Sequence, residues 1–304
     1  MVRPELAVPL GLVLAGTGTV GYAWAYERKS FRLREYDVPV LPADAAPIRV
    51  LHISDMHVTP GQPWKVDWIR SLAELKPDLV IDTGDNMAHL DAVDETLRAL
   101  EPLLALPGAF VPGSNDFFAP RMKNPMRYLM PDTGRRHHGP RLPWGELRLA
   151  FRGAGWLDLT HRRTTIDIRG QRVELAGVSD PHIKADNYDR VAGPVDPRAV
   201  VGLGLTHSPE PRVLDRFVAD GFRLMFAGHT HGGQLRVPGY GALVTNCGLD
   251  RKRARGLSEY GPPAASAYLH VSAGLGTSPY APVRFACPPE AALLRLGPAR
   301  ANSR

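Results

Sequence analysis

The sequence predicts an α/β fold class, in which one apolar helix precedes an α/β domain. Two patterns in the 304 residues carry this prediction. Short apolar and β-branched runs, typical of buried strands, alternate with amphipathic segments that have the period of a helix. A stretch without any charged residue, Leu6–Tyr26, stands before the first of these units. With 44% hydrophobic and 22% charged residues, the chain has the composition of a globular protein rather than a disordered one.

The uncharged stretch Leu6–Tyr26 matches the about 20 residues that a membrane-spanning helix needs. We therefore expect residues 1–27 to form a transmembrane helix or signal anchor and the protein to be membrane-associated. A signal peptide cleaved near Ala23-Trp24-Ala25 is the alternative. Basic residues follow the stretch and only Arg3 precedes it, which favours a cytoplasmic domain, whereas an export signal gives the opposite. Both orientations of the domain relative to the membrane therefore stay as alternatives.

Residues 28–47 are proline-containing and predict a linker or an edge strand, after which a single domain is expected over 48–297. This domain begins with the strand Ile48–Ser54, and Asp55 and His57 follow its carboxyl end. Open α/β sheets bind their ligands at this end of the strands. In extended backbone, residues i and i+2 point to the same side, so we expect both side chains to face one site.

The same order of strand, polar side chain and helix is repeated twice. The strand Leu79–Thr83 ends at Asp85, and the strand Ala109–Pro112 ends at Gly113-Ser114-Asn115-Asp116. The glycine before Asp85 allows close approach of the backbone to a site. We expect the helices between and after these strands at Trp64–Leu75, Val93–Leu104 and Trp144–Ala154.

In the second half of the domain, three histidines likewise follow the carboxyl ends of apolar strands. His207 follows an apolar strand, and His229 and His231 lie in the loop Gly228–Gln234, where we expect extended backbone to turn both side chains toward one metal cluster. A lone His-x-His pair is weak evidence for a metal, since such histidines are more often core or surface residues. We expect six strands and one helix here: Thr164–Ile168, Val173–Gly177, Val201–Thr206, the helix from Ser208 to Val218, Leu224–Ala227, Ala267–Val271 and Ala291–Leu296, before a frayed tail at 298–304.

Five ordered motifs resemble one known family. Asp55-x-His57, Gly84-Asp85, Gly113–Asp116, His207 and Gly228–His231 are similar in order and spacing to the calcineurin-like metallophosphoesterases, over about residues 48–296. The stretches Val271–Ser278 and Cys287–Glu290 resemble its membrane-associated bacterial branch. The resemblance implies a four-layer α/β/β/α sandwich that holds two divalent metal ions.

The resemblance also implies the roles of individual residues. It assigns Asp55, His57 and His231 to the first metal, Asn115, His207 and His229 to the second, and Asp85 to a position that bridges them. Mixed nitrogen and oxygen ligands suit Mn, Fe or Zn better than Mg or Ca. Two cations about 4 Å apart activate a hydroxide for attack on a phosphoester. This agrees with the lack of a Gly-x-Ser-x-Gly elbow in the sequence.

The third motif departs from the family pattern. The family usually reads Gly-Asn-His-Asp or Gly-Asn-His-Glu, with the asparagine as ligand and the histidine assisting the leaving oxygen. Aligned without a gap, Ser114 takes the ligand position; shifted by one residue, Asn115 does, and Asp116 stands where the histidine was. We prefer Asn115, because an amide oxygen coordinates a cation better than a hydroxyl. The usual histidine is missing either way, and three side chains are candidates to replace it: Asp116, His137 and His138.

Charge gives a weaker indication of the partner. The net charge of +6 and the pI of about 9.5 suit an anionic partner, and equally suit a solvated basic surface. A basic, methionine-rich loop at Ala119–Pro143 is a candidate lid, or else a solvated loop. Four basic residues lie close together in the sequence: Arg251, Lys252, Arg253 and Arg255. We expect this cluster either to contact a substrate phosphate or a membrane surface, or to be ordinary surface charge.

These patterns favour a metal-dependent phosphohydrolase of the phosphodiesterase or pyrophosphatase type. Its expected substrate is a phosphorylated small molecule or lipid, such as a lipid-linked or nucleotide-linked compound. A nuclease is an alternative, but no basic groove rich in aromatic residues for stacking bases is found, so nucleic acid is not the expected partner. A non-catalytic metal-binding membrane scaffold is the other alternative, favoured by the missing histidine.

Overall fold

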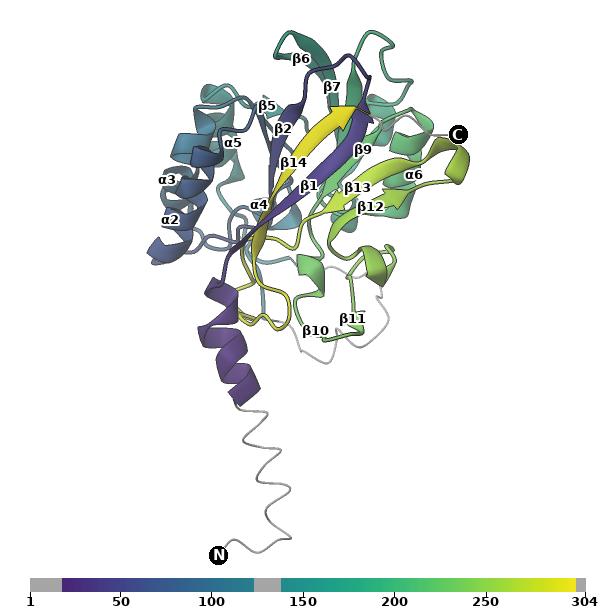
Figure 1. Ribbon diagram of the computed structural model, residues 1–304. Coiled ribbons are helices and arrows are strands. Elements are labelled where there is room, and N and C mark those ends of the chain that lie inside the picture. Colours follow the sequence, from purple (N-terminus) through teal and green to yellow (C-terminus); the bar gives the residue numbers. More distant parts are fainter. Residues whose placement is uncertain (1–17, 123–137, 299–304) are drawn as a thin grey trace, which may run out of the picture.

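The computed structural model describes residues 18–122 and 138–298 (Figure 1). Two six-stranded sheets form the centre of the domain. The first has the order β1 (Arg32–Leu41), β14 (Glu290–Pro298), β2 (Ile48–Ile53), β3 (Leu79–Asp82), β4 (Gly108–Phe110), β5 (Leu157–Asp158). The second has the order β12 (Gly256–Tyr260), β13 (Ala267–Val271), β9 (Leu224–Ala227), β8 (Val201–Leu205), β7 (Gln171–Gly177), β6 (Arg162–Ile168). A short ribbon of β10 (Arg236–Val237) and β11 (Gly241–Ala242) stands apart.

Alternation of side chains along the strands explains the layers. Leu224 and Phe226 of β9 lie in the core between the two sheets, whereas Met225 and Ala227 pack against α6 (Pro211–Ala219). The outer face of the first sheet shares a core with α2 (Pro63–Ser71), α3 (Val93–Leu104) and α5 (Trp144–Gly153). The layers are therefore helix, sheet, sheet and helix. Figure 1 shows α2, α3 and α5 against the first sheet.

Parallel pairing brings the polar strand ends together. In the first sheet β2, β3, β4 and β5 run parallel, and in the second β7, β8, β9 and β13 do. Carboxyl ends of parallel strands lie at one edge of a sheet. The loops that follow β2, β3, β8 and β9 therefore share one end of the molecule, next to the short helix α4 (Ser114–Phe117) that follows β4.

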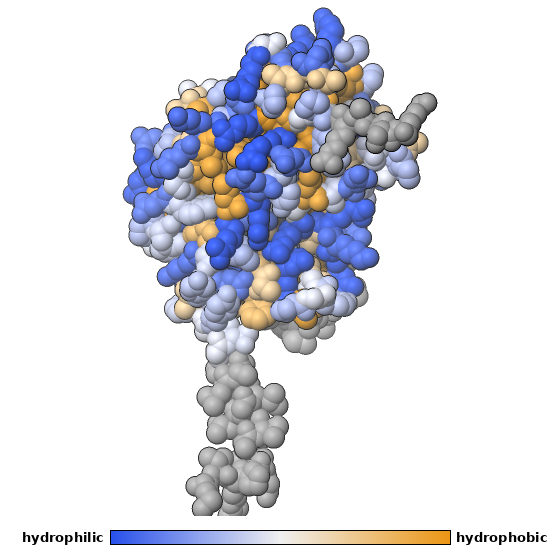
Figure 2. All heavy atoms as spheres, viewed as in Figure 1, coloured by the Kyte–Doolittle hydropathy of each residue, from blue (hydrophilic) through white to orange (hydrophobic). Residues whose placement is uncertain are grey.

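The segment 28–47, expected as a linker or an edge strand, contains the edge strand β1. It pairs in parallel with β14, from Arg32 opposite Glu290 to Val38 opposite Leu296. Val38 and Leu41 are buried in the core between the sheets. Hydrophilic side chains cover the outward face of this strand (Figure 2). The first sheet thus begins at residue 32, before the expected start of the domain at residue 48.

The expected membrane segment lies largely outside the described residues, since residues 1–17 are not among them. Residues 18–25 are helical. Across 18–122 and 138–298, no helix reaches the length and apolarity that crossing a bilayer requires. Val20, Tyr22 and Trp24 of this helix are exposed. Most of the candidate lid, residues 123–137 with His137, and the tail from residue 299 also lie outside the described residues.

Candidate metal centre

The loops after β2 and β3 are held together by their backbones. The amide of Asp55 donates to the Gly84 carbonyl at 2.8 Å, and the amide of His57 donates to the Asp85 carbonyl at 3.0 Å. Gly84 has a φ of +88°, and a Cβ at this position would overlap the backbone of Gly113. The glycine before Asp85 therefore permits the close approach that the sequence predicts.

Five of the expected ligands adopt left-handed backbone conformations. Their φ angles are +50° for Asp55, +43° for His57, +57° for Asp85, +69° for His229 and +48° for His231. Such angles are uncommon for residues with a side chain and cost about 1 to 3 kcal/mol each, so the surrounding structure must hold them in place. Concentration of this strain at one end of the sheets is typical of a functional site.

The expectation of extended backbone is therefore wrong at Asp55 and His57, and it is wrong at His229 and His231 as well. Thr230 between them is in the right-handed helical region, and its hydroxyl accepts a hydrogen bond from the Gly232 amide. The short 3-10 helix η6 (His231–Gly233) starts at the second histidine. The two imidazoles therefore serve different groups: His231 lies with Asp55 and His57, whereas the His229 ring lies 5.3 Å from the His207 ring.

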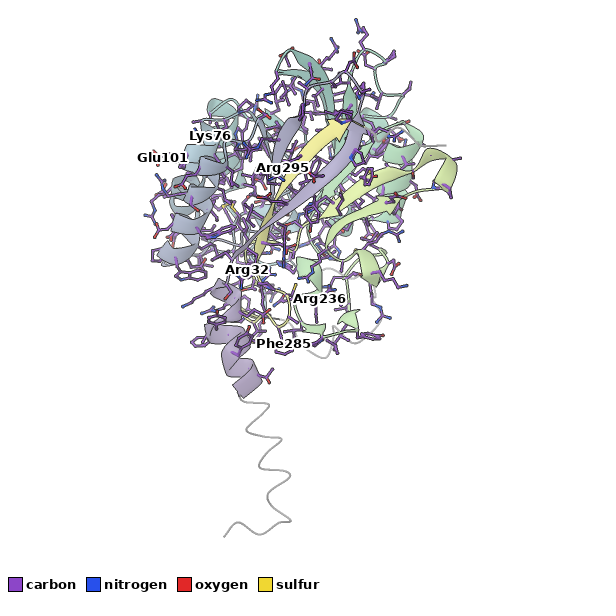
Figure 3. The ribbon with its side chains drawn as sticks, viewed as in Figure 1. Arg32, Lys76, Glu101, Arg236, Phe285 and Arg295 are labelled. Carbon is purple, nitrogen blue, oxygen red and sulfur yellow. The ribbon has the colours of Figure 1, made fainter. Side chains whose placement is uncertain are left out.

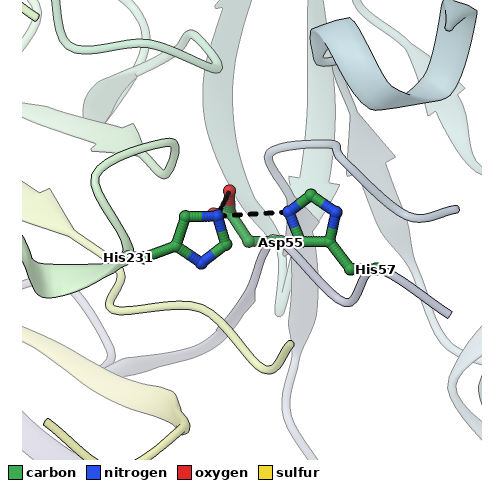
Figure 4. Close-up of side chains that lie close together, drawn as sticks. All are labelled: Asp55, His57 and His231. Carbon is green, nitrogen blue, oxygen red and sulfur yellow. Dashed lines mark hydrogen bonds and ion pairs between the residues drawn. The ribbon is translucent and has the colours of Figure 1, made fainter. Parts of the chain in front are cut away.

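The first group of candidate ligands is Asp55, His57 and His231 (Figure 4). The two Nε2 atoms of the histidines face each other at 3.1 Å, and Nε2 of His231 lies 3.6 Å from Oδ1 of Asp55. Burial lowers the pKa of His57 to about 4 and that of His231 well below its ordinary value. Both imidazoles are therefore neutral, which is the form that binds a cation.

The second group is Asp55, Asp85 and His207. The two carboxylate oxygens of Asp85 face different histidines: Oδ2 lies 3.6 Å from Nε2 of His57, and Oδ1 lies 3.5 Å from Nε2 of His207. Asp85 thus lies between the first group and His207, as a bridging ligand must.

The contacts of His207 indicate whether a cation fits at this site. Its Nδ1 lies 2.7 Å from the carbonyl oxygen of Thr83 and donates to it, which orients Nε2 toward Asp85. Buried Nε2 has no hydrogen-bond partner within the described residues. A lone pair that faces a carboxylate needs a positive charge between them, either a proton or a metal ion. The donor set and this unpartnered nitrogen therefore fit a divalent cation.

The charges at the centre are strongly coupled. Burial raises the pKa of Asp55 to about 6. Burial also acts to raise the pKa of Asp85, but the neighbouring His207 outweighs it and holds that pKa well below its ordinary value. Burial acts to lower the pKa of His207, but Asp85 and Asp180 raise it well above its ordinary value. Asp85 is consequently ionised and available to a cation.

Asn115 and His229 lie beside these groups. The backbone amide and the side-chain amide of Asn115 donate to the two oxygens of Asp85, at 2.6 and 2.7 Å. The backbone amide of His229 donates to the carboxylate of Asp55, while its Nε2 lies 3.2 Å from the Asn246 carbonyl. The His182 ring lies tilted against the His229 ring, with 4.2 Å between the two ring centroids.

Asp116, a candidate replacement for the missing histidine, is fully buried. Its carboxylate accepts backbone hydrogen bonds from Gly113 at 2.8 Å and from Asp85 and Asn86 at 2.9 Å each. These bonds join the loops after β3 and β4. Burial raises the pKa of Asp116 to about 7. The carboxylate is committed to the backbone, so we propose that Asp116 positions Asp85 and does not contact substrate. His138, the other described candidate, stacks on Phe118.

A buried chain of hydrogen bonds that the sequence did not indicate ends at the centre. Ser54 Oγ donates to Asp55 at 2.6 Å and accepts from Thr83 Oγ1 at 2.7 Å. His52 Nε2 lies 2.9 Å from Thr83 Oγ1, and His52 and His270 share a hydrogen bond of 2.7 Å between their Nδ1 atoms. The available signal was a histidine within each of two largely apolar strands, β2 and β13.

The buried pair predicts a pH-dependent stability. Burial lowers the pKa of His270 to about 3. Below its ordinary pKa of 6.5, the unfolded chain takes up a proton here that the folded chain does not, so stability falls as the pH falls toward 3. From pH 7.5 to 5.0 this loss is about 2 kcal/mol. In urea unfolding, His270→Gln should therefore gain about 2 kcal/mol relative to the parent over this range.

The matched control is His89→Gln, since His89 is exposed. Because its exposed contact with Asp91 contributes little, the stability of this variant relative to the parent should change by less than about 1 kcal/mol over the same range. A constant difference for His270→Gln would contradict the assignment of a neutral buried imidazole at this position.

Arg284 is a further residue that the sequence did not single out. Its side chain is completely buried and donates to the carbonyls of Ala273, Gly276 and Cys287, at 2.7 to 3.1 Å. The amide of Gly276 in turn donates to the carbonyl of Asp55 at 2.7 Å. Arg284 thus fixes the loop after β13 against the loop that carries Asp55.

Comparison with known proteins agrees with this geometry. Residues 48–233, more than half of the chain, match the calcineurin-like phosphoesterase family. Phosphodiesterase YaeI of Escherichia coli is 26% identical over 93% of this chain and 94% of its own length. The metallophosphoesterase YkuE of Bacillus subtilis is 23% identical over 95% and 93%. UDP-2,3-diacylglucosamine pyrophosphatase LpxG of Chlamydia trachomatis is 24% identical over 90% and 92%.

The family match covers the strand ends that hold Asp55, Asp85, His207 and His231. The motifs that suggested the family are therefore the residues that the fold assembles into one centre. Relatives named as a phosphodiesterase and as a pyrophosphatase cover nearly the whole chain. The protein belongs to the calcineurin-like phosphoesterase family and is a hydrolase of phosphoester bonds.

Proposed function

We propose that the protein is a two-metal phosphohydrolase that cleaves a phosphodiester or pyrophosphate bond in a lipid- or nucleotide-linked substrate. The position of Asp85, with one oxygen toward His57 and the other toward His207, carries this proposal. The first metal would be held by Asp55, His57 and His231. The second would be held by His207 with Asn115 and His229, and Asp85 would bridge both.

Bound Mn, Fe or Zn would supply Lewis acidity, which lowers the pKa of a water and neutralises charge on phosphoryl oxygens. The chain itself orients the ligands. Lys65 donates to the carbonyls of Met56 and His57, at 2.8 and 3.2 Å, and Ser54 donates to Asp55. Asn115 holds both oxygens of Asp85. These contacts fix the candidate ligands before a substrate arrives.

The relatives support the two bond types in the proposal. One is named a phosphodiesterase, and another is named for hydrolysis of the pyrophosphate of UDP-2,3-diacylglucosamine, a nucleotide-linked lipid. The N-terminal apolar stretch Leu6–Tyr26 agrees with a lipid substrate, and attachment to a membrane through it remains part of this proposal.

The proposal is tested by hydrolysis of bis-p-nitrophenyl phosphate by the full-length protein. We expect turnover with Mn²⁺, its loss in EDTA and its return when Mn²⁺ is added back. A nucleotide-linked pyrophosphate lipid should also be cleaved. Failure to hydrolyse either substrate with any divalent metal, in a folded protein that binds the metal, would instead favour the non-catalytic scaffold. Turnover unaffected by EDTA would contradict the metal requirement.

A further inference from the structure

A basic cavity lies next to the candidate metal centre without being part of it. It has a volume of about 580 Å³ and opens between the β10–β11 ribbon and the short 3-10 helix η7 (Arg251–Arg253). Four cationic side chains line it: Arg236, Arg251, Lys252 and Arg255. None of the four forms an ion pair within the part of the chain that the structure describes.

The acidic residue in the cavity lining, Asp250, does not neutralise the four cationic side chains. Asp250 accepts a hydrogen bond from the Lys252 amide at 3.0 Å, and its other oxygen lies 3.4 Å from Arg253. Four cations therefore share the cavity with one carboxylate that is already engaged. Burial lowers the pKa of Arg236, and the nearby Arg255 lowers it further. An anion in the cavity would relieve this repulsion.

The cavity wall is connected to the loop that holds His231. Arg236 Nη1 donates to the carbonyl of Gly232 at 2.8 Å, and Arg255 Nη1 lies 3.8 Å from Sγ of Cys287. The thiol of Cys287 in turn lies 3.4 Å from the carbonyl of His231. An anion bound here is thus a neighbour of the candidate metal centre, separated from it by the η6 backbone.

Exposed apolar side chains surround the cavity mouth. Leu235, Val237, Tyr240 and Leu243, on and beside the β10–β11 ribbon, are between 41% and 64% exposed. The guanidinium of Arg251 lies over the Tyr240 ring at 5.6 Å. Cations beside exposed aromatic and aliphatic side chains are typical of surfaces that meet the boundary between lipid headgroups and acyl chains.

The N-terminal helix is fixed at this same end of the molecule. Figure 3 shows Arg236 and Phe285 near each other beside it. The amide of Arg236 donates to the Phe285 carbonyl at 2.9 Å, and the Tyr22 ring contacts the Phe285 ring edge-on at 6.4 Å. Tyr22 and Trp24 are exposed on this helix, and the uncharged sequence from Leu6 leads into it. The apolar and basic features therefore converge on one side.

We propose that this cavity binds the phosphate of an anionic phospholipid headgroup, with the acyl chains along the exposed side chains of the β10–β11 ribbon. The four cations match the phosphate, and the apolar mouth matches the lipid rather than a free anion. Bound lipid would hold the candidate metal centre facing the lipid surface. The binding requires no metal ion and no hydrolysis, so it is independent of the proposed activity.

The test uses full-length protein in an uncharged detergent with EDTA, titrated with phosphatidylglycerol, and counts bound lipid by native mass spectrometry. Arg251→Glu with Lys252→Glu should weaken binding at least about tenfold, since each cation near an anionic lipid contributes about fivefold. The neutral pair Arg251→Gln with Lys252→Gln should weaken binding less. The control pair, Arg152→Glu with Arg190→Glu, makes the same charge change at two exposed residues outside the cavity and should leave binding unchanged.

Three results would overturn the proposal. Equal losses in the cavity pair and the control pair would show a non-specific effect of net charge. Inorganic phosphate that binds as tightly as the lipid would show that the apolar mouth contributes nothing. An oligonucleotide that binds the parent more tightly than the lipid, and not the cavity variant, would assign the cavity to nucleic acid.

Discussion

Replacement of Asp85 by asparagine should reduce metal-dependent hydrolysis of bis-p-nitrophenyl phosphate on the order of a thousandfold. The two oxygens of Asp85 face His57 and His207, at 3.6 and 3.5 Å, and the carboxylate is ionised. The amide of asparagine offers one neutral oxygen, so it cannot bridge two cations. A thousandfold loss corresponds to about 4 kcal/mol of transition-state stabilisation.

The matched control is Asp82→Asn, three residues earlier in the chain. Burial raises the pKa of Asp82 to about 8, so its carboxyl is mostly neutral at pH 7, and Oδ1 accepts a hydrogen bond from the Gly84 amide at 2.9 Å. Asparagine can keep this bond without a change of charge. Turnover should therefore stay within about threefold of the parent. Equal losses in the two variants would contradict a specific role for the Asp85 carboxylate.

Replacement of Asp116 by alanine should destabilise the protein by about 3 to 5 kcal/mol. The change removes one carboxylate and leaves three buried backbone amides, those of Gly113, Asp85 and Asn86, without acceptors. Because two of these amides belong to the loop of Asp85, metal affinity should fall with stability. Urea unfolding and a Mn²⁺ titration measure the two effects, and Asp116→Asn, which retains one acceptor oxygen, should lie between alanine and the parent.

Asp167→Ala is the control for this substitution. The Asp167 carboxylate accepts one hydrogen bond from the Gly170 amide at 2.9 Å, at an exposed hairpin turn. Its loss should cost about 1 kcal/mol or less. If Asp116→Ala instead leaves stability and metal affinity intact but shifts the pH dependence of turnover, Asp116 acts as an acid in place of the missing histidine.

Local pattern predicted much of the fold. The helix Val93–Leu104 and the strands Leu224–Ala227 and Ala267–Val271 lie where the periodicity of apolar residues places them. Strand β1 was harder to predict, because its partner β14 is at the other end of the chain. A linker and an edge strand have similar composition, and the choice between them depends on that distant pairing.

The candidate site was predicted as a set of residues but not as a geometry. Asp55, His57, Asp85, His207 and His231 meet as their motifs indicate. The left-handed backbone at Asp55, His57, Asp85 and His231 could not be predicted, since aspartate and histidine rarely adopt it without support from the rest of the fold. Contacts such as His52 with His270 join the two sheets and are likewise visible only after folding.

We propose that the two groups of side chains at the strand ends hold one divalent cation each. The most direct test is a count of metal ions per chain by inductively coupled plasma mass spectrometry, after equilibration with Mn²⁺ and gel filtration. The parent should retain two ions, whereas His231→Ala, in the first group, and His207→Ala, in the second, should each retain one. Two ions in both variants, or none in the folded parent, would contradict the claim.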